Sequence, residues 1–122
     1  MTAVFLKFGD DGRAAMLRGA RRLACAMAVT LGPRGSTVLI ERMGGGAPRV
    51  TKDGVTVADA LEEEGRFEQL GLRLVRRAAQ RVGEEIGDGT TTTAILACAL
   101  AAEAQKAAAA GLDLSAVRFG VE

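Results

Sequence analysis

Histidine is absent from this sequence, and only two cysteines occur among its 122 residues. Cys25 and Cys98 lie far apart without a CxxC spacing, so the usual zinc sites and the histidine-dependent catalytic dyads and triads are excluded. Because neither cysteine belongs to such a site, we expect both to be small buried thiols.

Long apolar runs are also missing. No run approaches the roughly 20 residues that a membrane-spanning helix needs, and the N-terminus lacks the basic and apolar regions of a secretory signal. Since the sequence shows neither an export signal nor a disulfide framework, the expected compartment is the reducing cytoplasm.

Neither sign of charge dominates. Sixteen Lys and Arg residues against fifteen Asp and Glu residues give a formal net charge of +1, so the sequence indicates neither nucleic acid nor an anionic membrane as a partner. The content of 48% apolar and 25% charged residues instead favours one globular domain with a modest core.

Three segments have the apolar periodicity of helices. The first, residues 13–31, should end at Gly32-Pro33, because glycine tolerates a left-handed exit and proline cannot continue the hydrogen-bond ladder. The second follows an acidic cluster at residues 62–64, and its arginines form a solvated face. The third begins near Thr90, runs through an alanine-rich stretch and stops at Gly111. Its small side chains imply close packing between helices. The apolar stripe of the second helix comprises Phe67, Leu70, Leu74, Ala78, Val82 and Ile86.

Two short β-prone runs, Thr37–Ile40 and Arg49–Thr51, flank a glycine-rich connection and predict a hairpin over about 37–51. Two strands alone are marginally stable in water, so a third strand is expected from elsewhere in the chain or from a neighbour. A short helical piece is expected near 57–61, and Asp113 is a candidate N-cap for a last helix. The predicted fold class is mainly α with a small β-hairpin.

The loop from Gly87 to Thr93 has residues suited to phosphate. N–H groups at a helix N-terminus, glycines that permit close approach and threonine hydroxyls are all suitable donors, and Asp88 could hold Mg²⁺. Alternatively, Asp88 or Thr90 simply caps the helix. The loop matches neither a Walker A motif nor the dinucleotide fingerprint, so any nucleotide site here is of another kind.

Two further loops are ambiguous when taken singly. Thr30–Gly35 can present backbone groups to a ligand or be a plain helix stop, while the near-neutral charge argues against a KH-type RNA-binding loop. Lys52-Asp53-Gly54 is explained by an Asp-Gly turn. Alternatively, its carboxylate orients or deprotonates water, with the lysine near phosphate charge.

Five sequence blocks follow one another along the chain: Lys7-Phe8-Gly9, Met16-Leu17-Arg18-Gly19, Thr30-Leu31-Gly32-Pro33-Arg34-Gly35, Thr51-Lys52-Asp53-Gly54-Val55 and Gly87-Asp88-Gly89-Thr90-Thr91-Thr92. Taken in this order, they closely resemble the group I chaperonins, the GroEL type. The resemblance runs from about Phe5 to Gly120 and covers only the N-terminal part of that family's equatorial domain. We therefore expect residues 1–122 to be the N-terminal half of an equatorial, ATP-binding domain, with the apical and intermediate domains absent.

The resemblance implies an ATP site built from the three loops, with ATP and Mg²⁺ as cofactors and K⁺ as a further candidate cation. Asp88 would ligate Mg²⁺, and Asp53 would lie beside the γ-phosphate and its attacking water as the candidate catalytic residue. The residues expected to contact the nucleotide or its phosphates are Thr30, Leu31, Gly32, Pro33, Lys52, Gly54, Asp88, Gly89, Thr90, Thr91 and Thr92.

The same resemblance sets limits on activity. In the family, hydrolysis also needs an aspartate of the intermediate domain, and the C-terminal equatorial segment holds the base and ribose, so we expect this chain to bind ATP without turning it over. Unfolded substrates and the co-chaperonin would be bound only by missing domains. Other chaperonin subunits are the expected partners, through a hairpin like the family's stem loop. The alternative is a non-catalytic structural or self-assembly module.

Departures from the family pattern lie outside the phosphate loops. Arg34 replaces the usual lysine, and the hairpin tip Gly44-Gly45-Gly46 is one residue longer than in GroEL. Neither change alters a residue expected to contact phosphate.

Overall fold

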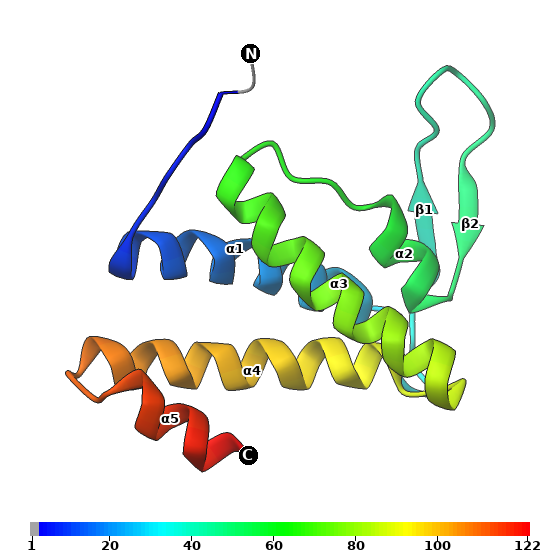
Figure 1. Cartoon of the computed structure of the whole chain (residues 1–122). Helices are drawn as coiled ribbons and strands as arrows, with labels where there is room; N and C mark the ends of the chain where they lie inside the picture. Colours follow the sequence, from blue (N-terminus) through cyan, green and yellow to red (C-terminus); the bar gives the residue numbers. More distant parts are fainter. Residues whose placement is uncertain (1–2) are drawn as a thin grey trace.

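The computed structural model describes residues 3–122 and is mostly helical, with one antiparallel hairpin. This confirms the predicted fold class. Figure 1 shows α1 and α4 side by side, α3 lying diagonally across them, and the hairpin standing next to α2. The elements in chain order are α1 (Gly9–Ala28), β1 (Val38–Ile40), β2 (Arg49–Thr51), α2 (Gly54–Ala60), α3 (Arg66–Ile86), α4 (Thr90–Ala109) and α5 (Leu114–Val121).

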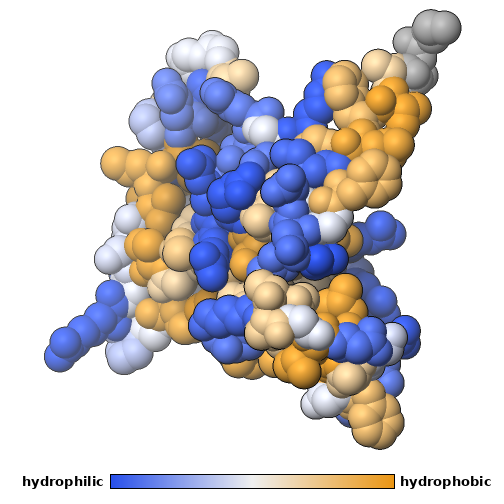
Figure 2. All heavy atoms as spheres, turned by 90° about the vertical axis from the view of Figure 1, so that its left-hand side faces the viewer, coloured by the Kyte–Doolittle hydropathy of each residue, from blue (hydrophilic) through white to orange (hydrophobic). Residues whose placement is uncertain are grey.

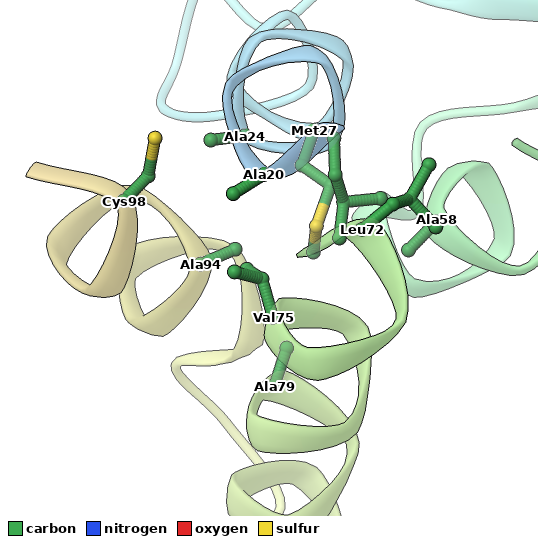
Figure 3. Packing of buried hydrophobic residues seen from close by; sticks show 10 residues of the cluster. Ala20, Ala24, Met27, Ala58, Leu72, Val75, Ala79, Ala94 and Cys98 are labelled. Atoms are coloured by element: carbon green, nitrogen blue, oxygen red, sulfur yellow. The ribbon is translucent and has the colours of Figure 1, made fainter. Parts of the chain in front are cut away.

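The core lies where α1, α3 and α4 meet, and small side chains dominate it (Figure 3). Leu23, Met27 and Leu72 are its largest fully buried side chains. Since the remaining members are mostly alanines, the helices approach closely, as the alanine-rich sequence predicts. The buried cluster comprises Ala20, Leu23, Ala24, Met27, Ala58, Leu72, Val75, Ala79, Ala94 and Cys98.

Two glycines form the crossing of α1 and α3. A Cβ atom added to Gly19 would lie 1.8 Å from the carbonyl oxygen of Glu68, and one added to Gly71 would lie 1.8 Å from that of Met16. Each helix therefore presses its glycine against the backbone of the other. No side chain of any size fits at this crossing.

The buried face of α3 differs from the predicted stripe. Leu70, Leu74 and Ile86 are 48%, 59% and 74% exposed, so the expectation that this stripe is the packed face was wrong. The close approach at Gly71 instead turns the neighbouring face towards α1 and α4. The buried residues of α3 are Gln69, Gly71, Leu72, Val75 and Ala79.

Two helix boundaries and one cysteine also differ from expectation. The first helix starts before residue 13 and ends at Ala28, because the N–H groups of Thr30 and Leu31 already form turn bonds to the carbonyls of Met27 and Ala28. The short helix begins at Gly54 rather than near 57.

Cys98 is buried and burial raises the pKa of its thiol, but Cys25 is exposed, so the prediction of two buried thiols fails for Cys25.

The hairpin and the last two helices follow the prediction. Val38 pairs with Thr51 and Ile40 with Arg49, and α4 begins at Thr90. Asp113 occupies the N-cap position of α5, although its side chain makes no capping hydrogen bond. Across residues 3–122, none of the helices combines the length and apolarity needed to cross a bilayer.

Candidate functional site

Gly54 is the point at which all three candidate loops meet. It is buried at the start of α2, and a Cβ atom there would lie 2.2 Å from Oγ1 of Thr91 and 3.2 Å from Oγ1 of Thr30. The loop after α1, the loop before α2 and the start of α4 are therefore in contact. Only glycine leaves the two threonine hydroxyls in this arrangement.

Asp53 caps α2. Its carboxylate accepts hydrogen bonds from the backbone N–H groups of Val55 and Thr56 at 3.2 and 3.1 Å, and from the Thr56 hydroxyl at 2.7 Å. The bond from the Thr56 side chain, with support from the backbone bonds, holds the pKa of Asp53 below its usual range. A carboxylate with a lowered pKa is a weak base, so it is better suited to orienting a water molecule than to deprotonating it.

Two glycines in the left-handed conformation flank Asp88. Gly87 ends α3 and Gly89 precedes α4, both with φ near +82°. The side chain of Asp88 accepts a bond of 2.7 Å from the N–H of Gly89, and no side chain caps α4. The simple capping role for Asp88 or Thr90 therefore does not apply, and the first N–H groups of α4 have no capping side chain as a partner.

An open cleft of about 700 Å³ lies between the start of α2, the end of α3 and the loop before α4. Its size is within the usual range for small-molecule sites. Asp53 and Asp88 therefore face one common space, although they are distant in sequence. The cleft is lined by Asp53, Val55, Gln80, Gly83, Glu84, Gly87, Asp88 and Thr90.

The remaining predicted residues divide into two groups. Thr30 and Thr91 place their hydroxyls beside Gly54, but neither residue lines the cleft. Residues 31–33, Lys52 and Thr92 are exposed and likewise are not among the residues that line the cleft. The loop after α1 is nevertheless a defined turn, in which the N–H of Gly35 donates to the carbonyl of Gly32 at 2.9 Å.

The sequence reasoning missed the part of the cleft that α3 contributes. Gln80, Gly83 and Glu84 line it, and they precede Gly87 by seven, four and three residues respectively, which are helical spacings. The available signal was the periodicity of the helix that leads into the Asp88 loop, because residues at these spacings share one face. That face ends in the loop itself.

The donor set suits a magnesium ion shared with phosphate. Among residues 3–122, no three His, Cys, Asp or Glu side chains come together to form a metal cage. Mg²⁺ in nucleotide sites typically takes only one or two carboxylates and completes its shell with phosphate oxygens and water. Asp88, exposed between two glycines, can supply such a carboxylate.

Comparison with known proteins agrees with the resemblance found in the sequence. The sequence model of the TCP-1/cpn60 chaperonin family matches residues 23–122. Two proteins named Chaperonin GroEL 2 from Cereibacter sphaeroides are 46% identical to this chain over all 122 residues. The chain spans 22% of the length of these curated relatives.

Solved structures give the same result for the fold. Two crystal forms of the chaperonin gp146 from the bacteriophage EL 2 (Pseudomonas aeruginosa), in presence of ATP-BeFx, align with TM-scores of 0.68 and 0.67 at 35% identity. Each alignment covers 75% of this chain and 16% of the phage protein. The arrangement of helices described above is thus shared with a solved chaperonin.

Proposed function

This chain belongs to the TCP-1/cpn60 chaperonin family, and we propose that it carries the phosphate- and magnesium-binding loops of a chaperonin ATP site. The observation that supports this most is the meeting of the three loops at Gly54, where an added Cβ would displace the hydroxyls of Thr30 and Thr91. Residues 1–122 then correspond to the N-terminal half of an equatorial domain of a cytoplasmic chaperonin.

The proposed roles follow from the chemistry of each loop. Asp88 ligates Mg²⁺, which neutralises phosphate charge when bound. Residues 89–92 offer N–H and hydroxyl donors to the phosphates at the positive end of the α4 dipole. Gly54 brings the loops that carry Thr30 and Thr91 together. Residues 30–33, Lys52 and Gly54 do not line the cleft and are proposed to contact the nucleotide beside it, with K⁺ as a further candidate cation. Asp53, which lines the cleft, would orient a water molecule towards the γ-phosphate.

Binding without turnover is the activity that we propose for the chain itself. The cleft has acidic and hydroxyl-bearing walls, but its lining includes neither an aromatic side chain nor a bulky apolar one larger than Val55 against which a base could stack. Recognition is therefore expected to depend on phosphate and metal. Folding of unfolded proteins and co-chaperonin binding are proposed only for longer chaperonin chains that include the other domains.

Isothermal titration calorimetry with Mg·ATP tests this proposal. We expect saturable binding that EDTA abolishes, because the metal links Asp88 to the phosphates. AMP, which lacks the β- and γ-phosphates, should give no binding at the same concentrations. Binding of AMP as tight as that of ATP, or ATP binding that is indifferent to EDTA, would count against the proposed site.

A second proposal, assembly with other chaperonin subunits, is supported by the hairpin. Within residues 3–122, β1 and β2 pair only with each other, so each strand has a free edge. Leu39, Met43 and Val50 are 70%, 103% and 62% exposed. Figure 2 also shows apolar surface gathered on the segment that leads into α1 and on α5. Exposed apolar surface with free strand edges favours association.

Light scattering over a dilution series tests the assembly proposal. The expected average mass is above that of the 12.6 kDa monomer, and it should fall as the protein is diluted. A strict monomer at every concentration would rule out self-association through the hairpin, while leaving the nucleotide proposal unaffected.

A further inference from the structure

A polar stripe runs along α3 on the side that faces α2 and the segment after it. It consists of Gln69, Arg76 and Gln80, which share one helix face at spacings of i, i+7 and i+11. The stripe continues at its C-terminal end into Gly83 and Gly87, which line the cleft. Its three polar side chains therefore point towards the element that carries Asp53.

Each member of the stripe bonds to α2 or to the residues that follow it. Gln69 is buried, and its Oε1 accepts from the N–H of Glu63 at 2.7 Å. Arg76 donates to the carbonyl of Leu61, just after the helix. Gln80 donates from Nε2 to Oδ1 of Asp59 at 2.9 Å.

Gln80 differs from the other two in its position. Its partner lies on α2 itself, and it is the one member of the stripe that also lines the cleft. With only seven residues, α2 is too short to be stable alone, so it depends on its tertiary contacts. Its apolar contacts are small, because the buried residues are Gly54, Val57 and Ala58.

The Gln80 amide also suits the charge of the cleft. Asp53, Glu84 and Asp88 already line it with carboxylates. An amide donates to Asp59 without adding a negative charge that would repel phosphate, and without a cation that would compete for these carboxylates.

From these contacts we infer that Gln80 is a positioning residue: through Asp59 it holds α2, and with it Asp53, against the Asp88 loop. The inference rests on the proposed function only for the identity of the ligand. Gln80 itself need not touch the nucleotide. Its effect is exerted through the orientation of a short helix that the side-chain hydrogen bond from Gln80 to Asp59 joins to α3.

The test compares Gln80→Met, which keeps the side-chain length but removes the donor, with Asp59→Ala, the double variant, and Asp59→Asn as the matched control. Asparagine keeps the acceptor oxygen, so Asp59→Asn should behave like the unmodified chain. In the other variants we expect faster amide hydrogen exchange in residues 54–60 and roughly two- to fivefold weaker Mg·ATP binding, the range of one exposed hydrogen bond. The double variant should be no worse than either single one.

Several outcomes would overturn the inference. Unchanged exchange of α2 in Gln80→Met would show that the bond does not hold the helix. Faster exchange with unchanged Mg·ATP affinity would show that the position of α2 does not affect nucleotide binding. Additive losses of affinity in the double variant would show that Gln80 and Asp59 act independently. If the unmodified chain does not bind Mg·ATP, the proposed function fails, and the exchange of residues 54–60 alone decides whether Gln80 positions α2.

Discussion

Gly19→Ala is expected to destabilise the chain by at least about 3 kcal/mol, or to prevent folding, as overpacking does when the surroundings cannot yield. The added Cβ would lie 1.8 Å from a backbone oxygen of α3. A backbone atom cannot change rotamer, so the helices must separate, and the alanine core beneath them loses its contacts. Gly71→Ala, at the reciprocal position, should have the same effect. Urea unfolding followed by circular dichroism measures both.

Gly120→Ala is the matched control for this prediction. Gly120 is also helical, on α5, but a Cβ there meets nothing within 4 Å. Because alanine has the higher helix propensity, the change should be neutral or stabilising by up to about 1 kcal/mol. If Gly19→Ala unfolded at the same urea concentration as the unmodified chain, α1 and α3 would not cross at these glycines.

Asp88→Ala is expected to weaken Mg·ATP binding by about 100-fold or more while leaving stability almost unchanged. Loss of residues that merely support a metal ligand typically costs 10- to 100-fold in affinity, so loss of the ligand itself should reach at least the upper end of that range. Stability should change little, because Asp88 is exposed and, among residues 3–122, its side chain accepts a hydrogen bond only from the N–H of the adjacent Gly89. Calorimetry and thermal unfolding measure the two effects separately.

Glu85→Ala supplies the control for charge. Glu85 lies at the same end of α3 and is exposed, but it pairs with Arg81 and is not among the residues lining the cleft. Its removal takes away the same charge from the same region, so affinity should change little. Equal Mg·ATP affinity for Asp88→Ala and Glu85→Ala would remove Asp88 from the metal site.

Local features of the sequence predicted most of the secondary structure. Glycines and prolines mark the ends of helices and strands, and N-cap positions such as Asp113 mark the starts of helices. The hairpin and the helix from Thr90 were therefore predicted with small errors in their bounds. These signals depend on neighbouring residues only. They can therefore be interpreted without knowledge of the tertiary structure.

The packed face of α3 could not be predicted in the same way. Leu70 and Leu74 form as clear a stripe as Leu72, Val75 and Ala79, and periodicity cannot choose between adjacent stripes. The choice is made by the crossing of two glycines that lie far apart in sequence. In a sequence, a glycine within a helical segment is ordinarily taken to lower helix stability, not to mark a contact between helices.

The candidate site was predicted as three separate loops, and its assembly depends on long-range contacts. Nothing local to Gly54 indicates that the hydroxyls of Thr30 and Thr91 lie against it. Likewise, the contribution of Gln80 to the cleft follows from how α2 packs on α3. The sequence therefore indicated which residues have suitable chemistry, while the structure is needed to see which of them face the same space.

The most direct test of the account is a titration of the ¹⁵N-labelled chain with Mg·ATP, observed by NMR one amide at a time. If the three loops form a single phosphate and magnesium site, the amides of residues 30–32, 34–35, 52–54 and 88–92 should shift together and follow one binding curve. Shifts confined to one of these loops, or centred on the hairpin, would contradict the account.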